Sequence, residues 1–314
     1  MVARRAEKKA RKCGKCVKCS RAVYCSDMCR NHFTDYFEKK VKKTVKKFGM
    51  FSKKHKVGVG ASGGKDSTTL LFVLKRLGYK VEAITANSGI PLYSDKNLRN
   101  LRSMCDKYGI RLTTLFFRDE FGGSLSKIMS ALSKKGLNYS HCFVCGVLRR
   151  YVLNKYAKKQ GFDCLATGHN LDDEAQSFVM NVFRNDLTLA KRQGPVSGES
   201  ESKLFVKRVK PLYFCSEKEI TAYSKLMKLP VNFKPCPHRR NSYRREYADM
   251  LDRFEKKYPP TKHNIIRFFL RTIHKMKDKD IDKEVVISTC EKCGEPCADK
   301  LCKKCQILGA LKSK

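Results

Sequence analysis

The spacing of hydrophobic residues divides this chain into three regions. Apolar side chains recur at helical spacing from Phe33 to Phe48, which predicts a helix beside a segment rich in cysteine and lysine. Beyond residue 55, short apolar runs alternate with helical patterns. We expect strands over 56–61, 80–87, 111–117 and 162–168, helices over 67–78, 94–109 and 145–160, and mainly helical structure over 217–228 and 239–277. Strands separated by helix-length segments predict an α/β fold with a doubly wound parallel sheet.

Glycine and capping residues indicate several boundaries. Gly78 is expected to end the first of these helices. Gly109 is expected to end the next one, which Ser94 or Asp95 would cap. A polar loop rich in Gly and Ser follows over 192–203. The predicted organisation is a cysteine-rich module with a basic helix over 1–50, a main α/β domain with a helical extension over 51–285, and a second cysteine-rich module over 286–314.

The charge of the chain favours a polyanionic partner. Among 314 residues, 68 are Lys or Arg and 30 are Asp or Glu, which gives a net charge of +38. Such an excess repels itself in the folded state, and basic residues spread along the chain suit contact with a phosphate backbone. We find neither an apolar run long enough for a membrane span nor the apolar segment of a secretory signal. A cytoplasmic protein without a membrane partner is therefore expected.

The segment VGVGASGGKDSTTLL is the strongest chemical signal. A predicted strand runs into the loop Ser62-Gly63-Gly64-Lys65-Asp66-Ser67 and then into a helix. Glycines allow backbone N–H groups to close around an anion, and the helix N-terminus adds its positive end. This is not a Walker A motif, because Asp66 stands where Ser or Thr would bind magnesium. The loop resembles the PP-loop of ATP pyrophosphatases, which cleave ATP between its α and β phosphates and hold the released pyrophosphate there.

A second segment, ATGHNLDDEAQ over 166–176, follows a predicted strand and opens a helix. Ligands of an open parallel sheet lie at the carboxyl ends of its strands, so both loops are expected on the same rim. Asp172 and Asp173 are candidates to hold Mg²⁺ against the phosphates. An acidic pair in the first turn of a helix is also ordinary complementation of the helix dipole. The neighbouring GHN and DE residues favour the functional interpretation.

Sixteen cysteines without a secretion signal favour metal ligands or reactive thiols over disulfides. Near the C-terminus, two CxxC pairs have the spacing of a four-thiolate structural zinc site, with Cys297 to spare. The expected ligands are Cys290, Cys293, Cys302 and Cys305.

The N-terminal module predicts a second structural zinc ion, because neither module has enough apolar residues for a core of its own. The favoured ligands are Cys16, Cys19, Cys29 and His32. Cys13 could replace Cys19, and Cys25 could replace Cys29. Cysteines in apolar patterns elsewhere are expected to be buried and inert, namely Cys105, Cys164 and Cys215.

The central cysteines have several interpretations. Cys142 and Cys145 lie one helical turn apart, and Cys236 lies in a loop between two prolines. Three thiolates can hold a [4Fe–4S] cluster in which one iron has no protein ligand. They could also hold zinc with His141 or His238 as the fourth ligand. Alternatively, Cys142 and Cys236 could form a thiol pair that carries a persulfide through a disulfide intermediate.

The order of these motifs resembles a known family. SGGKDS, a mid-chain CxxCG followed by two basic residues and a tyrosine, ATGHNLDDEAQ, RQGP, a lone CP and terminal CxxC modules are similar to those of the NcsA/TtuA/CTU-type tRNA 2-thiouridine synthetases. The resemblance covers nearly the whole chain. It implies a tRNA sulfurtransferase that uses ATP to adenylate O2 of a tRNA uridine, after which sulfur displaces AMP at C2. It also implies a [4Fe–4S] cluster, held by three cysteines, that carries the sulfur on its free iron.

The resemblance assigns roles to matching residues. Cys142, Cys145 and Cys236 would hold the cluster, and Asp173 falls on the functional aspartate of the family. Arg149 stands where some members have a lysine near the cluster, and these two cations are not interchangeable. Asp66 would act in catalysis, while Lys65 and the loop amides would stabilise charge on the phosphates. The implied ATP site comprises Ala61, Ser62, Gly63, Gly64, Lys65, Asp66, Ser67, Asn87, Gly168, His169 and Asp172.

The expected target is the wobble uridine at position 34, because the segment after Cys236 is reminiscent of the branch directed at the anticodon. Alternatives are thiolation of uridine 54 or s²C32-type thiolation by the same fold. A zinc-dependent RNA-binding protein with a degenerate nucleotide fold is the non-enzymatic alternative, against which the intact loop and Asp173 argue. Expected partners are tRNA and a sulfur donor, which would be sulfide, a cysteine persulfide or a ubiquitin-like thiocarboxylate protein. The resemblance also implies a homodimer.

Overall fold

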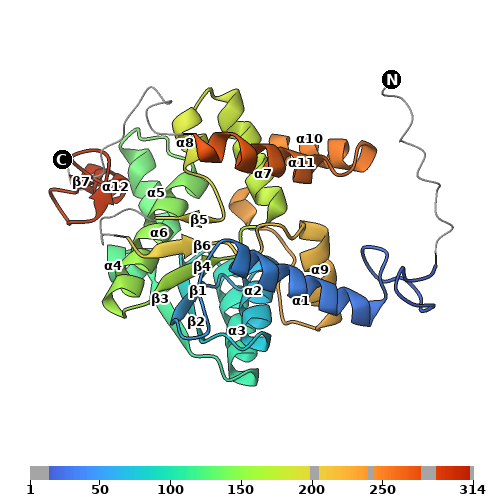
Figure 1. Ribbon diagram of the computed structural model, residues 1–314. Helices are drawn as coiled ribbons and strands as arrows, with labels where there is room; N and C mark the ends of the chain where they lie inside the picture. Colours follow the sequence, from blue (N-terminus) through green and yellow to red (C-terminus); the bar gives the residue numbers. More distant parts are fainter. Residues whose placement is uncertain (1–13, 199–204, 240–242, 277–287, 312–314) are drawn as a thin grey trace.

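The computed structural model describes residues 14–198, 205–239, 243–276 and 288–311. Within them, a six-stranded sheet has the order β3–β2–β1–β4–β6–β5, and its neighbours are parallel except β5 and β6 (Figure 1). The strands are β1 (Val57–Gly60), β2 (Val81–Asn87), β3 (Leu112–Phe116), β4 (Cys164–Thr167), β5 (Val196–Ser197) and β6 (Lys207–Val209). The predicted doubly wound α/β fold is confirmed. The two strands missing from the prediction have two and three residues, too few to display a period.

Helices cover both faces of the sheet. On one face lie α1 (Arg30–Lys47), α2 (Lys65–Arg76), α3 (Tyr93–Lys107) and α9 (Glu217–Leu226). The other face carries α4 (Phe117–Phe121), α5 (Leu125–Lys134), α6 (His141–Lys159) and α12 (Lys303–Ala310). Helix α1 belongs to the main core, since the ring of its fully buried Phe37 stacks on Tyr223 with centroids 4.3 Å apart.

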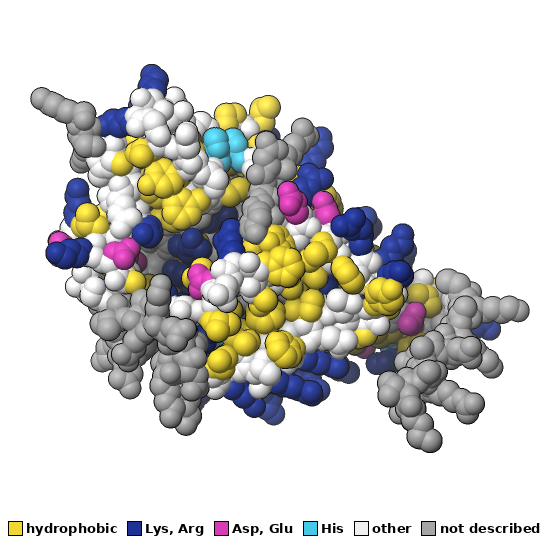
Figure 2. Space-filling model, turned by 90° about the horizontal axis from the view of Figure 1, so that it is seen from above, with side chains coloured by type: hydrophobic (Ala, Val, Ile, Leu, Met, Phe, Trp, Pro, Cys, Tyr) yellow, Lys and Arg dark blue, Asp and Glu magenta, His cyan; other side chains and the backbone are white. Residues whose placement is uncertain are grey.

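A second group of helices comes from two stretches of the chain, one between β4 and β5 and one after α9. It comprises α7 (Leu171–Phe183), α8 (Leu187–Lys191), the short turn η1 (Pro237–Arg239), α10 (Tyr243–Lys257), α11 (Thr261–Arg271) and the turn η2 (Ile273–Lys275). Helices α10 and α11 pack on α7 through buried Leu171, Leu251 and Ile266. Seen from above, hydrophobic side chains gather on the face where α8, α10 and α11 lie, with Lys and Arg around them (Figure 2). Phe183 at the end of α7 and Phe268 on α11 are exposed.

Helix boundaries depart from the prediction at two informative places. Helix α6 begins at His141, because the Ser140 side chain caps it by accepting a hydrogen bond from the Phe143 N–H. Both central CxxC cysteines therefore lie on one helix. Helix α3 begins at Tyr93, so the prediction of a Ser94 or Asp95 cap is wrong; the Ser94 hydroxyl instead accepts from the Ile90 N–H. As predicted, left-handed glycines follow the ends of α2 and α3.

The terminal modules are small. The C-terminal one has a two-stranded sheet, β7 (Ser288–Thr289) and β8 (Pro296–Cys297), followed by α12, which packs on α6. The N-terminal one contains isolated bridges and is held to the main body by a hydrogen bond from the Tyr24 hydroxyl to the Ala222 carbonyl. Across the described ranges, none of the helices has both the length and the apolar character needed to cross a membrane.

Candidate functional site

The glycine-rich loop lies at the carboxyl end of β1. Gly63 has a φ of +75°, and a Cβ there would approach the Asn97 carbonyl oxygen to 2.3 Å, so this position requires glycine. The Ser67 hydroxyl closes the turn, because it accepts from the Ser62 N–H at 3.0 Å and donates to the Gly64 carbonyl at 3.3 Å. The start of α2 is thereby directed at the rim of the sheet, where its free N–H groups can bind an anion.

The loop after β4 packs directly against this turn. A Cβ on Gly168 would lie 2.8 Å from the Ser67 backbone nitrogen, so two main chains meet here. The Asn170 amide donates to Asp66 at 3.2 Å, and Asn170 and Asp173 form a capping box at the start of α7. Between the loops is a cavity of about 320 Å³. Seven of the expected ATP-site residues line it: Ala61, Ser62, Gly64, Asp66, Ser67, Gly168 and His169.

The cavity contains two carboxylates with opposite environments. Burial opposes ionisation of Asp173, but the guanidinium of Arg244 and the ring of His169 outweigh it and lower the pKa of this carboxyl. Arg244 donates to the Asp173 carboxylate at 3.1 Å and to its carbonyl at 2.8 Å. Burial raises the pKa of Asp66 despite the ammonium of Lys65 beside it. Arg244 escaped prediction because its contribution depends on how α10 packs on α7.

Three expected ATP-site residues occupy other positions. The Lys65 ammonium is paired with Asp66 at 3.0 Å and Glu217 at 2.8 Å, beside the cavity lining. Gly63 faces Asn97, as its close approach requires. Asn87 lines the neighbouring cavity, and its side chain accepts from the Gly89 N–H.

Asp172 does not line the cavity between the two loops. One carboxylate oxygen accepts from the ammonium of buried Lys262 on α11, and the other accepts from the Glu217 N–H at 2.7 Å. Both oxygens are thus engaged in joining α7 to α11 and α9. Consecutive residues of a helix point to different sides, so Asp173 lines the cavity and Asp172 does not. Binding of Mg²⁺ by Asp172 stays a prediction.

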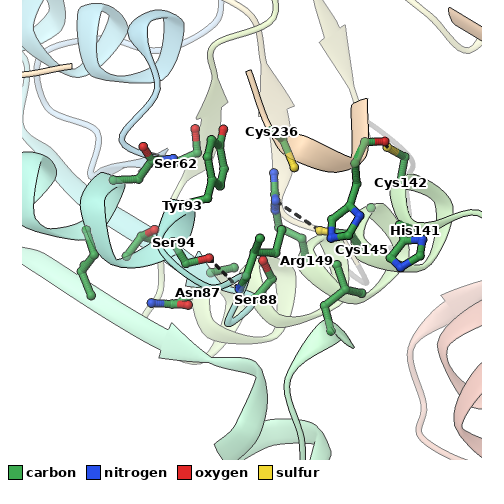
Figure 3. Close-up of a pocket in the computed structure, with 18 residues that line it drawn as sticks. Ser62, Asn87, Ser88, Tyr93, Ser94, His141, Cys142, Cys145, Arg149 and Cys236 are labelled. Carbon is green, nitrogen blue, oxygen red and sulfur yellow. Dashed lines mark hydrogen bonds between the residues drawn. The ribbon is translucent and has the colours of Figure 1, made fainter. Parts of the chain in front are cut away.

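A second cavity, of about 300 Å³, contains the central cysteines. Cys142 and Cys145 project from the first turns of α6, and Cys236 approaches from the segment before η1 (Figure 3). Cys142 is exposed, and its thiol donates to the His238 carbonyl at 3.6 Å. The rings of His141 and His238 stack with centroids 4.2 Å apart. Burial raises the pKa of the Cys236 thiol.

Arg149 joins the two cavities. It lines both of them, as do Ser62 and Ala86, and Figure 3 shows its side chain between Ser62 and the three cysteines. Its Nη2 donates to the Cys145 sulfur at 3.3 Å. Its Nε is buried and has no hydrogen-bond partner among the residues that the structure describes. An orphaned guanidinium donor next to thiols fits a site that receives an anionic group.

A main-chain contact brings Cys236 to this place. Residue Asn232 forms a parallel bridge with Gly64 of the glycine-rich loop. Four residues later the chain reaches Cys236, which packs against the apolar cluster of α5 and α6. Cys236 follows Cys142 by about a hundred residues in the sequence. This contact places it beside Cys142, at the rim of the sheet where the glycine-rich loop lies.

The two terminal sets of predicted zinc ligands are assembled as expected. In each set the four ligand atoms lie within 4.8 Å of one another. Zn–S bonds of about 2.3 Å place tetrahedral sulfurs about 3.8 Å apart. The sulfurs of Cys19 and Cys29 are 3.8 Å apart, and those of Cys293 and Cys302 are 3.6 Å apart. Cys25 and Cys297 lie outside these groups, and Cys13 lies outside the described residues.

Hydrogen bonds favour the thiolate form of one cysteine in each set. Burial opposes ionisation of Cys16 and Cys290, but backbone N–H groups outweigh it and lower the pKa of each to about 6. By contrast, burial raises the pKa of Cys105 to about 11 and that of Cys164 to about 12. The latter two are buried in the core, as expected for inert thiols.

Comparisons with known proteins agree with this geometry. Residues 33–247 match the family described as the PP-loop domain. The sequence is 33% identical over 304 residues to a tRNA-5-methyluridine(54) 2-sulfurtransferase of Pyrococcus horikoshii, covering 95% of this chain and 94% of the relative. This chain belongs to the NcsA/TtuA/CTU-type family of PP-loop proteins. Members named for position 54 are thus among its relatives.

Other members of the NcsA/TtuA/CTU-type family carry different names. The sequence is 31% identical over 320 residues to the tRNA 2-thiolation protein NcsA of Haloferax volcanii, covering 96% of this chain and 98% of the relative. The structure is similar to that of the U34-tRNA thiolase NcsA from Methanococcus maripaludis with its [4Fe–4S] cluster. The TM-score is 0.79 at 30% identity, over 93% of this chain and 95% of that chain. The family assignment made from the motifs is confirmed.

Proposed function

We propose that this protein thiolates a tRNA uridine at C2 in two steps that use adjacent cavities. The observation that carries the proposal is the contact between them: Arg149, Ser62 and Ala86 line both the PP-loop cavity and the cysteine cavity. An activated uridine formed at one cavity is therefore within reach of sulfur held at the other. This juxtaposition supports the two-step chemistry better than a purely structural role for the thiols.

The first step would take place at the PP-loop. O2 of the uridine bonds to the α-phosphorus of ATP, and pyrophosphate leaves. The loop amides and the start of α2 stabilise the charge of pyrophosphate, with Lys65 close enough to assist. Asp66 and Asp173 both line the cavity, and they are the carboxylates that we expect to hold Mg²⁺.

The second step would replace the oxygen. Sulfur adds at C2, and AMP leaves with the original O2, so pyrophosphate and AMP account for the whole of ATP. Cys142, Cys145 and Cys236 line one cavity that also contains an orphaned arginine donor, and this donor set fits a [4Fe–4S] cluster. When bound there, the cluster would supply the sulfur for this step. Arg149 would stabilise negative charge near Cys145 and on the phosphate of the departing AMP.

Position 34 is our proposed target, since this is the position in the name of the Methanococcus maripaludis thiolase. The Pyrococcus horikoshii relative is named for position 54. We propose sulfide or a ubiquitin-like thiocarboxylate protein as sulfur donor, two structural zinc ions in the terminal modules, and a homodimer in the cytoplasm. One relative, from Caenorhabditis briggsae, has the name cytoplasmic tRNA 2-thiolation protein 1.

The test is reconstitution with anaerobically purified protein. The enzyme is incubated with ATP, Mg²⁺, sulfide and an unmodified tRNA transcript that has uridine at both 34 and 54. We expect AMP formation that depends on tRNA, and 2-thiouridine on nucleoside mass spectrometry. Transcripts with cytidine at 34 or at 54 identify the position. Mössbauer spectra of the same sample should contain a [4Fe–4S] signal; full activity of an iron-free sample would contradict the cluster.

A further inference from the structure

The largest of the described cavities is lined by residues that have no role in the proposed chemistry. It has a volume of about 660 Å³ and lies between α1, α11 and η2. We call it the α1–α11 groove. Six lysine and arginine side chains line it: Lys40, Lys43, Lys47, Arg267, Arg271 and Lys275. None of the residues assigned above to ATP, zinc or the cluster contributes to it.

Most charges of the groove have no acidic partner. In the part of the chain that the structure describes, five of these six side chains form no ion pair, and the groove lining contains no Asp or Glu. Lys40 is the exception, since it is paired with Glu219 at 2.9 Å. Like charges gathered around one hollow repel one another in the folded state, and an anionic ligand removes that cost.

The floor of the groove is aromatic. The rings of Phe48 and Phe214 stack with centroids 5.9 Å apart, and the Lys47 ammonium lies 5.3 Å and 5.1 Å from them. Cations above an apolar floor match a phosphate backbone with its attached sugars and bases better than they match a small inorganic anion. The volume is also in the range of nucleotide-sized sites.

The groove and the PP-loop share a supporting helix. In the first turn of α9, Glu219 pairs with Lys40 at the groove, while Glu217 pairs with Lys65 of the loop. From the other side, Lys262 at the start of α11 pairs with Asp172, the neighbour of Asp173 in the nucleotide cavity. These contacts fix the groove at a defined position relative to the active site.

We propose that the α1–α11 groove binds a stretch of the tRNA phosphate backbone while the target uridine occupies the active site. The proposal rests on the proposed function, because the RNA bound there is the substrate. It assigns to this groove a share of the affinity for tRNA and no part in the chemistry.

Matched double variants test the groove. Arg267→Gln with Arg271→Gln removes two groove charges, and Lys158→Gln with Lys159→Gln removes two exposed charges at the far end of α6. All four side chains are exposed, and glutamine keeps helix propensity. For the groove variant, we expect about tenfold weaker binding of an unmodified tRNA transcript and a salt slope smaller by about 1 to 2. The control should keep wild-type affinity.

Steady-state kinetics distinguish a loss of tRNA binding from a loss of catalysis. In the groove variant KM for tRNA should rise, while kcat at saturating tRNA and the affinity for ATP stay unchanged. If the variant melts below the wild type, Lys43→Gln with Lys275→Gln repeats the test from α1 and η2. Equal tRNA binding by groove and control variants, with thiolation intact, would overturn the groove and leave the proposed function standing. Wild-type protein that neither binds nor thiolates tRNA would overturn both.

Discussion

The terminal and the central cysteines of this chain contrast in how they are enclosed. Each terminal set brings four ligand atoms within 4.8 Å of one another, and its members are buried or half-buried. The central set has three cysteines that line a cavity, of which Cys142 is exposed. It is not among the compact groups found in the described residues.

An enclosed set of ligands suits a role in folding, and an open set suits a role in a reaction. A closed tetrahedral site uses every metal bond for structure, whereas a site with an open position can meet a substrate. At the centre, the open side faces a second cavity, and Arg149 lies where the two meet. Under the proposed function, closure rather than the presence of CxxC would distinguish the structural sites from the reactive one.

The strongest challenge to this contrast is Cys236→Ala. We expect thiolation to fall below detection and the iron signal to be lost, because one of three thiolates is missing. Zinc content, measured on the same sample by mass spectrometry of metals, should stay at two ions per chain, and ATP affinity should be unchanged. Full activity of this variant would remove Cys236 from the central set.

Cys302→Ser tests the enclosed C-terminal set of ligands. Removing one of four ligands should release one zinc ion per chain and unfold the C-terminal module, because metal binding there is folding free energy. Since Ile307 of α12 packs in the same cluster as Cys145, we expect thiolation to fall about tenfold, a typical cost of lost support around a site. Limited proteolysis and metal analysis measure the effect, with Cys29→Ser as the N-terminal counterpart. A variant that retains both zinc ions would contradict the assignment.

Variants of Arg149 test the boundary between the two cavities, both of which this residue lines. Arg149→Gln removes the donor to Cys145 and the charge between the cavities, and should lower the rate of thiolation about a hundredfold. Arg149→Lys keeps the charge without the forked donors, so it should recover part of that loss. Single-turnover assays with saturating ATP and tRNA measure both variants. Equal rates for the two would mean that charge at this position is unimportant.

The smallest effect is expected from Cys297→Ser. This thiol lies within the C-terminal module but donates to the Asp299 carbonyl at 2.8 Å, outside the compact set. A serine hydroxyl can make the same hydrogen bond. Zinc content should be unchanged and the free energy of unfolding should shift by less than about 0.5 kcal/mol in chemical denaturation. Loss of zinc would show that the ligand set is a different one.

Local signals explain what the sequence could predict. Alternation of short apolar runs with helical spacing identified the four long strands, and the glycines of the PP-loop identified the phosphate site before any contact was known. Ligand spacing identified both compact cysteine sets. Each of these features depends on residues near one another in the chain.

Features that depend on packing between distant elements were missed. Arg244 lies in a stretch with several arginines, and only the packing of α10 on α7 selects it as the partner of Asp173. In the sequence Asp172 is equivalent to Asp173, and only the position of Lys262 on α11 distinguishes the two. The helical start at His141 followed from a serine cap that the apolar pattern does not contain.

The bridge between Gly64 and Asn232 affects which amino-acid replacements the site can tolerate. The segment that delivers Cys236 is fastened to the PP-loop through main-chain atoms, so most side-chain replacements at these positions leave the fastening intact. Proline is the exception at a position that must donate its N–H. Sulfur chemistry and nucleotide binding are thus linked by a connection that varies little with amino-acid identity, and residues lining either cavity can diverge without separating the two halves of the site.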